Sequence, residues 1–429
     1  MSESPTNPSA VEKPTPTNVG GQAVIEGVMM RAPGSLSVVC RRMDGSLVLR
    51  ERTIPPSNPA LTKIPVLRGA YTFFSALKIG HQALQWSGRV MEADFKLADE
   101  AEKAGAKTPG TDSKTKSDTK SSAKSVSGAA KLSMMALTQA AMTAAGDLDD
   151  AKRSASAKKS DAAKSEPDAT SDEYVLVEEA PRSVFLTILP VLFAIGLYVL
   201  APQAAATGIA RWLGFDPELY PITHPVLQAF TGLAKLTIIV VLFLSLRQVR
   251  DFRRMFEYHG AEHMAISTYE KERPLLLANT RDVSALHARC GTTFIIMVAV
   301  VSVVIFSALG SVLPPIPAPG WVQWIVFFLL KLPLLPFIAG VTLEIQKVLA
   351  KYCTTGPLQV LLWPGFLVQK ITTAKPDDDQ LEVALASLRS ALANATVVLP
   401  EEHPDKSFDS YDNLVNSPAY TLQRGEAGA

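Results

Sequence analysis

Four apolar segments, each long enough to cross roughly 30 Å of hydrocarbon, constrain what this chain can fold into more than any other feature. They cover residues 184–202, 226–246, 293–313 and 321–345, and the last segment carries one interior charge, Lys331. Helices suit such segments because lipid offers no partners for exposed backbone groups. The sequence therefore predicts an α-helical integral membrane protein with about four transmembrane helices and a small cytoplasmic α+β module.

Basic residues indicate how these segments are oriented. The loop of residues 247–290 is rich in Lys and Arg, whereas residues 203–225 contain Arg211 alone and residues 311–320 contain none. Cytoplasmic loops carry such an excess, so the loop 247–290 is expected in the cytoplasm. Four crossings then return both termini to the cytoplasm, and membrane lipids are the expected contacts of this multi-pass protein.

Charge and cysteine usage exclude other classes of protein. The net charge of +1 is the difference between 42 basic and 41 acidic residues, so no overall field attracts nucleic acid and no nucleic-acid partner is expected. Cys40, Cys290 and Cys353 all lie on the predicted reducing face, so structural disulfides are not expected. The polar, proline-rich N-terminal residues do not resemble a cleaved export signal.

Composition divides the chain into segments of different character. The Pro- and Ser-rich arm and the Ala/Lys/Ser-rich insertion are too poor in apolar residues to form a core, so both are expected to be disordered; the insertion could recruit a cytoplasmic protein partner. The expected segments are a disordered arm (1–18), a cytoplasmic β-rich module with an interfacial helix (19–103), the disordered insertion (104–181), a membrane module with four spans and a histidine-containing loop (182–371), a cytoplasmic amphipathic helix (372–398) and a polar tail (399–429).

Local patterns place further elements in these segments. Asp44-Gly45 lies between the short apolar runs 37–40 and 47–49, which predicts a β-hairpin. Residues 64–86 have apolar positions three or four apart, and their interior charges favour an interfacial or tightly packed helix over a spanning one.

Two more patterns follow the last apolar segment. Residues 352–371 are interrupted by Trp-Pro-Gly and are too short in apolar residues to cross, which favours a surface-lying or re-entrant piece. Pro376 and the aspartates after it are start signals for the amphipathic helix, which is expected to pack on the N-terminal module.

The pentapeptide His259-Gly260-Ala261-Glu262-His263 carries the clearest chemical signal. Residues four apart share a helix face, so the two imidazoles could hold one divalent metal ion, Zn²⁺ or another, beside the glutamate. The spelling is that of the inverted zinc-protease motif, in which the histidines are ligands and the glutamate is the catalytic general base. The alternative is that these side chains cap helix ends or contact lipid headgroups and loop carbonyls.

A hydrolytic zinc site needs a third protein ligand. Glu344 is the first candidate because an acid at the end of the fourth apolar segment needs a partner. Lys347, three residues on, is the alternative partner for that acid. His287 is the second candidate ligand, and Cys290 could join it from a helix face.

Glu26 is another acid in an apolar setting, flanked by glycines that allow close backbone approach. A desolvated carboxylate there could serve as catalytic acid, base or ligand. The alternative is a structural carboxylate that accepts hydrogen bonds from Arg31 or turn amides.

Four strings, at residues 20–31, 259–263, 287–292 and 376–384, resemble in order the bacterial DUF1385 (YqhQ-like) membrane proteins. The resemblance covers roughly residues 19–103 and 182–395 and has no counterpart for the insertion. It implies a metal-dependent enzyme in the bacterial inner membrane. It also singles out the residues to test: Glu26, His259, Glu262, His263, His287 and Cys290.

These observations predict a metal-dependent membrane hydrolase that acts at the cytoplasmic face. His259 and His263 would hold the metal, Glu344 or His287 would complete its ligands, and Glu262 would take the proton from the attacking water. The substrate would be a peptide bond or a lipid-linked ester near the bilayer surface. The alternative is a non-catalytic membrane scaffold or a transport-associated factor.

Overall fold

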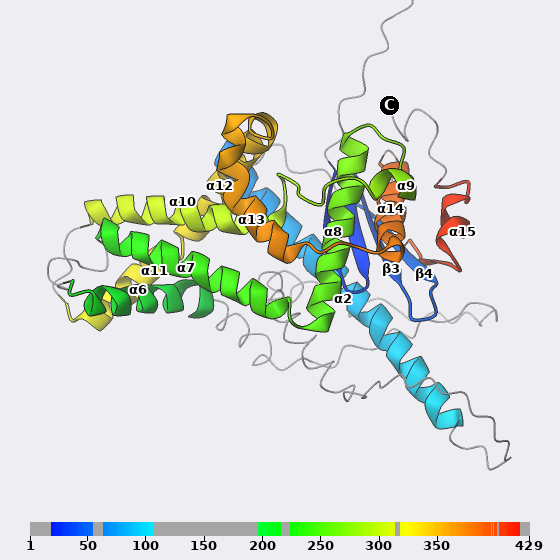
Figure 1. Ribbon diagram of the computed structural model, residues 1–429, viewed down its shortest axis with the longest axis horizontal. Coiled ribbons are helices and arrows are strands. Elements are labelled where there is room, and N and C mark those ends of the chain that lie inside the picture. Colours follow the sequence, from blue (N-terminus) through cyan, green and yellow to red (C-terminus); the bar gives the residue numbers. More distant parts are fainter. Residues whose placement is uncertain are drawn as a thin grey trace, which may run out of the picture.

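The computed structural model describes residues 19–54, 63–105, 196–215, 224–313, 318–395, 397, 399–400 and 403–420. These residues form a mixed α/β body from which an arm of apolar helices projects (Figure 1). The predicted arm of residues 1–18 and most of the insertion 104–181 lie outside the described residues.

The body is built on an antiparallel sheet in which strands follow one another in sequence order, β1-β2-β3-β4-β5. The predicted hairpin is confirmed, because β3 and β4 pair around Asp44, which accepts a hydrogen bond from the backbone of Ser46, and Gly45, whose φ is +90°. The strands are β1 (Gly20–Val24), β2 (Gly27–Ala32), β3 (Ser35–Arg41), β4 (Leu47–Thr53) and β5 (Lys406–Phe408).

Helices cover both faces of this sheet. Alternate residues of each strand point to opposite faces and therefore pack against different helices. Val28 and Met30 of β2 pack with α8 (Arg250–Glu270) and α14 (Asp378–Ala393). Met29, between them, packs on the other face with α2 (Pro65–Gly105). The body is therefore a three-layer arrangement, with α2 on one face and α8 and α14 on the other (Figure 1).

Helix α14 begins with a capping box, in which Asp377 and Gln380 exchange side-chain-to-backbone hydrogen bonds. It packs on the N-terminal sheet as expected, but it is buried on nearly all sides rather than amphipathic. The segment 399–429, expected to be a polar tail, contributes structure to the body: β5 pairs with β4, and α15 (Tyr411–Val415) packs against α14. Few apolar residues mark β5, so its pairing could not be read from a hydrophobic pattern.

A buried carboxylate connects three of these elements. Glu51 of β4, whose side chain is 1% exposed, accepts hydrogen bonds from Ser390 Oγ of α14 (2.7 Å) and Lys406 Nζ of β5 (2.8 Å). Burial alone would raise the pKa of Glu51, but the bonds from Lys406 and Ser390 outweigh it and lower that pKa. The ionised carboxylate therefore stabilises the packing of α14 on β4 and the pairing of β5 with β4.

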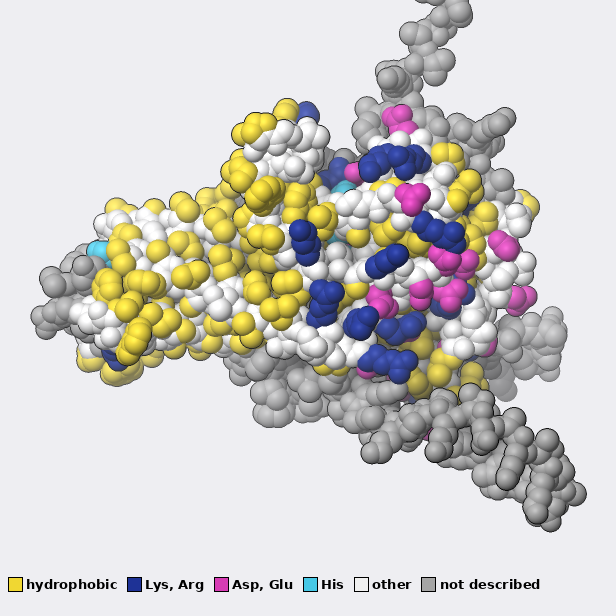
Figure 2. Space-filling model, in the orientation of Figure 1, with side chains coloured by type: hydrophobic (Ala, Val, Ile, Leu, Met, Phe, Trp, Pro, Cys, Tyr) yellow, Lys and Arg dark blue, Asp and Glu magenta, His cyan; other side chains and the backbone are white. Residues whose placement is uncertain are grey.

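The arm consists mainly of apolar helices, and Figure 2 shows apolar side chains along it while Lys and Arg gather over α8 and its junction with the arm. A π-helical turn, η1, leads into α6, and α11 is separated from α12 by a break at Leu332-Pro333. The elements are η1 (Gly196–Leu200), α6 (Ala201–Trp212), α7 (Pro225–Leu246), α10 (Gly291–Val312), α11 (Gly320–Lys331) and α12 (Leu334–Tyr352).

Two of the described helices, α7 and α10, are long and apolar enough to cross a membrane. Counting α11 and α12 as one broken span, bent by 49°, gives up to three. Four spans are not confirmed, since most of the segment 184–202 lies outside the described residues. The predicted fourth span differs in form, because Pro333 lacks a backbone N–H and interrupts the helix.

The helix expected at residues 64–86 is the first half of α2, which runs for 41 residues. It crosses α12 where two glycines meet: a Cβ on Gly69 would lie 2.5 Å from the Gly340 carbonyl oxygen. Further along, η2 (Pro357–Leu362) and α13 (Trp363–Thr372) form the short piece expected after the last apolar segment. Helix α13 packs against α10 and leads to the start of α14.

Candidate metal centre

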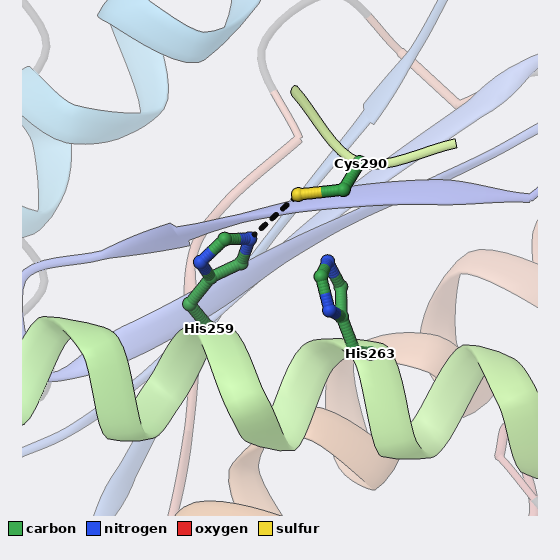
Figure 3. Close-up of side chains that lie close together, drawn as sticks. All are labelled: His259, His263 and Cys290. Carbon is green, nitrogen blue, oxygen red and sulfur yellow. Dashed lines mark hydrogen bonds between the residues drawn. The ribbon is translucent and has the colours of Figure 1, made fainter. Parts of the chain in front are cut away.

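Helix α8 presents His259 and His263 toward the loop that precedes α10 (Figure 3). The two imidazoles lie one helical turn apart, with ring centroids separated by 4.4 Å. Glycine at position 260 allows the chain between α13 and α14 to pass close, since a Cβ there would lie 2.2 Å from the Ala374 carbonyl oxygen. The helical spacing predicted from the sequence thus places both rings on one face.

Cys290 completes a cluster of three donor residues. It precedes α10, and its Sγ lies 3.3 Å from His259 Nε2 (Figure 3). One ligand atom from each of His259, His263 and Cys290 lies within 4.8 Å of the other two. Cys290 and His263 are buried, and the His259 side chain is 15% exposed. From the sequence, Cys290 was only an additional candidate ligand that could join His287.

The second nitrogen of each imidazole is already occupied. His259 Nδ1 lies 2.9 Å from the Thr372 carbonyl oxygen, and His263 Nδ1 lies 2.5 Å from the Ala285 carbonyl oxygen. A carbonyl can only accept a hydrogen bond, so both Nδ1 atoms carry the proton. In a neutral imidazole the lone pair is then on Nε2, which is the arrangement that metal-binding histidines usually adopt.

Glu262 lies beside the cluster and is 5% exposed. Its Oε2 is 3.9 Å from His259 Nε2 and 4.0 Å from His263 Nε2. Gly21 of β1 leaves the space for it, because a Cβ there would lie 2.8 Å from Glu262 Cγ. The carboxylate is therefore close enough to act on a small molecule held at the donor atoms without belonging to the group of three.

The charges of the cluster favour an ionised thiol. Burial would raise the pKa of Cys290, but His259 and His263 outweigh it and lower that pKa well below its usual value. Burial would likewise lower the pKa of His259, but Cys290 and Glu262 raise it to about 9. A thiolate next to positive charge is the form of cysteine that binds metals and attacks electrophiles.

His287 lies near the cluster but outside it. Its ring centroid is 5.7 Å from that of His263, and its Nε2 lies 3.2 Å from a carboxylate oxygen of Glu270, which also pairs with Arg289. Burial lowers the pKa of His287. The structure therefore directs this candidate ligand toward Glu270.

Two further sequence candidates lie elsewhere. Glu344 of α12 accepts hydrogen bonds from Arg68 Nη2 of α2 (2.6 Å) and Lys347 Nζ (2.9 Å), so the structure does not bring it to the histidine pair. Lys347 was the alternative partner expected from the sequence, and Arg68 was not foreseen.

Glu26, in the tight turn between β1 and β2 with a φ of +48°, is a partner of α8 rather than of the cluster. It accepts two hydrogen bonds from Arg254, at 2.6 and 2.5 Å, and lies 3.3 Å from Tyr258 Oη. Its basic partner is thus Arg254, where the sequence suggested Arg31.

Two buried glutamines that sequence reasoning missed hold the loop that carries Cys290. Gln369 of α13 donates to the His287 carbonyl oxygen (2.8 Å) and to Thr293 Oγ1 (2.6 Å), and accepts from the His287 backbone N–H (2.9 Å). Gln346 of α12 donates to the Ala288 and Cys290 carbonyl oxygens. The available signal was a glutamine among apolar neighbours on α13, since a buried amide needs partners. Gln346 carried no such signal, because charged residues surround it on α12.

The donor set of the cluster suits a metal of intermediate softness. Two neutral imidazole nitrogens and one thiolate are ligands that Zn²⁺ takes, and metal binding would displace the Nε2 proton that the raised pKa of His259 favours. The carbonyl-bound Nδ1 atoms meet the second requirement of such sites, which is a fixed ring orientation. The residue types of His259, His263 and Cys290 therefore fit a zinc site, and Glu262 lies next to the two imidazoles.

Comparisons with known proteins give a family match and one similar relative. A family model described as "Protein of unknown function (DUF1385)" matches residues 64–394. The protein named "Uncharacterized protein YqhQ" from Bacillus subtilis (strain 168) is 30% identical over 182 residues, which cover 41% of this chain and 54% of that protein. The chain thus spans about half the length of this curated relative. No solved structure matches the chain significantly.

Proposed function

We propose that this chain, which belongs to the DUF1385 family, is a membrane-associated, metal-dependent hydrolase whose ligands are His259, His263 and Cys290. The observation that carries the proposal is the convergence of their three donor atoms within 4.8 Å, with each imidazole held by a carbonyl at its other nitrogen. Two histidines that merely pack in a core would not need a cysteine sulfur next to them. The presence of Cys290 Sγ beside both imidazoles therefore supports a role of all three residues as metal ligands. In this proposal Cys290 is the third ligand, where Glu344 is the first candidate from the sequence.

The residues of the site divide the work of hydrolysis between them. His259, His263 and Cys290 would hold a divalent metal ion, which when bound would supply Lewis-acid activation of water and of the substrate carbonyl group. Glu262 accepts the proton of the attacking water and returns it to the leaving group, as a general base and then a general acid. The carbonyl oxygens of Thr372 and Ala285 keep the two imidazoles in the ligating tautomer. His259 is the most exposed of the three ligands, so substrate enters on its side.

The position of the site favours a substrate near the bilayer surface. The chain runs from the apolar helix α7 directly into α8, and Cys290 immediately precedes the apolar helix α10. Basic side chains lie at the junction of α7 and α8 (Figure 2), where Arg247, the C-cap of α7, donates to the Lys370 carbonyl oxygen. Such an excess of basic residues favours the cytoplasmic face of the cell membrane. A peptide bond or a lipid-linked ester at that face is the proposed substrate class.

Hydrolysis in ¹⁸O-labelled water tests the proposal without knowledge of the substrate. Full-length protein loaded with Zn²⁺ is incubated with a bacterial membrane extract and a peptide library, and labelled carboxylates are counted by mass spectrometry. Glu262→Gln should retain the metal but lose the labelled products, because it keeps the shape and removes the base. Glu257→Gln, on the same helix, is the matched control and should retain both metal and products.

Two outcomes would replace the proposal. Folded wild-type protein without affinity for any divalent metal would favour the alternative of a non-catalytic scaffold or a transport-associated factor. Labelled products that form without metal and disappear on alkylation of Cys290 would favour a cysteine nucleophile paired with His259, whose Nε2 lies 3.3 Å from the sulfur.

A further inference from the structure

The arm contains a second polar cluster, which shares no residue with the metal-ligand candidates, and two buried lysines dominate it. Lys235 of α7 is 7% exposed and Lys331 at the end of α11 is 6% exposed. Both line one cavity of about 20 Å³ between η1, α7, α10 and the break before α12. No aspartate or glutamate is among the described residues that line this cavity.

The contacts of the two ammonium groups replace only part of the solvation that these charges lose on burial. Lys235 Nζ donates to Ser302 Oγ at 3.3 Å and lies 4.6 Å from the centre of the Tyr198 ring. Lys331 Nζ donates to Gln203 Oε1 at 3.0 Å and to Gln228 Oε1 at 3.4 Å. Neutral oxygens and aromatic faces attract a cation, but a buried charge usually needs an opposite charge.

A third donor points to the sign of the missing group. Gln203 Nε2 is buried and has no hydrogen-bond partner among the described residues. Gln203 lines an adjoining cavity that shares Lys331 and Val199 with the first. An unpaired amide donor on a residue that contacts the Lys331 ammonium group favours an acceptor that carries negative charge.

The backbone around the cavity has the irregularity found at polar sites in apolar helices. Tyr198 and Val199 belong to the π-helical turn η1, and Leu332 belongs to the break between α11 and α12. Non-helical backbone within an apolar bundle is tolerated where it lines a polar cavity, and π-helical turns occur often at functional sites.

We propose that this cavity binds one small monovalent anion of halide size, held between Lys235 and Lys331. Its volume of about 20 Å³ exceeds the roughly 10–15 Å³ that one water molecule requires. The site is independent of the metal centre, so either can be tested without the other.

Thermal unfolding of the full-length protein in detergent tests the proposal with potassium chloride against potassium gluconate at equal ionic strength. Chloride should raise the Tm of the wild type saturably, by roughly 2 °C at a tenfold excess over its Kd. The double variant Lys235→Met, Lys331→Met should lose this rise. Lys351→Met, which removes an exposed lysine of α12, should keep it.

Bromide supplies a second readout that needs no variant. Crystals of the wild type soaked in sodium bromide should give an anomalous peak between the two Nζ atoms. Equal Tm values in chloride and gluconate, or no bromide peak in the cavity, would overturn the proposal. A rise produced only by phospholipid would overturn it as well, since the site would then hold a lipid phosphate.

Discussion

The substitution Gln369→Leu gives a direct test of how the Cys290 loop is held. Leucine is similar in size, so the change removes hydrogen bonds without opening a large cavity. The backbone N–H and carbonyl oxygen of His287 both lose their partner. Each buried group left unpaired costs about 1–3 kcal/mol, so the loop should lose roughly 2–6 kcal/mol of local stability.

Hydrogen–deuterium exchange measures this loss at the loop itself. A loss of about 2 kcal/mol corresponds to exchange roughly 30-fold faster, and larger losses give larger factors. Peptides that cover residues 284–290 should show the increase, whereas peptides from α14 should not. Gln248→Leu, which changes an exposed glutamine with one local hydrogen bond, is the control. Unchanged exchange of residues 284–290 in Gln369→Leu would refute the reasoning.

Three further changes test other parts of the account. Glu51→Gln should flatten the acid dependence of Tm. Because the folded pKa of Glu51 is lowered, its carboxylate stabilises the fold above the unfolded pKa, and this contribution is lost as the pH falls through the lower folded pKa. The wild type, but not the variant, should therefore lose it between about pH 5 and pH 2. Gly260→Ala should lower Tm, because the new Cβ would lie 2.2 Å from the Ala374 carbonyl oxygen, whereas Gly208→Ala in open space should not. Glu344→Gln should retain bound metal, measured by elemental analysis; loss of metal would restore Glu344 as a ligand.

The sequence predicted those features that depend on near neighbours. The Asp44-Gly45 turn fixed the hairpin, because the required backbone conformation suits glycine. The spacing of His259 and His263 placed both rings on one face, since helix geometry relates residues four apart. In each case the signal and the contact lie within a few residues of one another.

The features that the sequence did not predict depend on long-range packing. Cys290 reaches His259 because Gln346 and Gln369, from two later helices, hold its loop. Glu344 lies on a helix face turned toward Arg68, 276 residues earlier. Nothing in local spacing distinguishes these partners, so the choice of third ligand required the fold.

The arm shows a similar limit. Lys331 was recognised as a charge within an apolar segment, but Lys235 lies within another and is equally buried. The cavity that joins them depends on how α7, α10 and the broken helix pair assemble. The break itself follows from Pro333. This proline is visible in the sequence, but a prediction based only on the length of the apolar segment does not take it into account.

X-ray absorption at the zinc edge tests the central claim most directly. Full-length protein loaded with one equivalent of Zn²⁺ should show one sulfur neighbour at about 2.3 Å together with nitrogen or oxygen neighbours at about 2.0–2.1 Å. The sulfur signal should disappear in Cys290→Ser and persist in Cys353→Ser. A bound zinc without a sulfur neighbour, or the same sulfur signal in Cys290→Ser, would contradict the proposed centre.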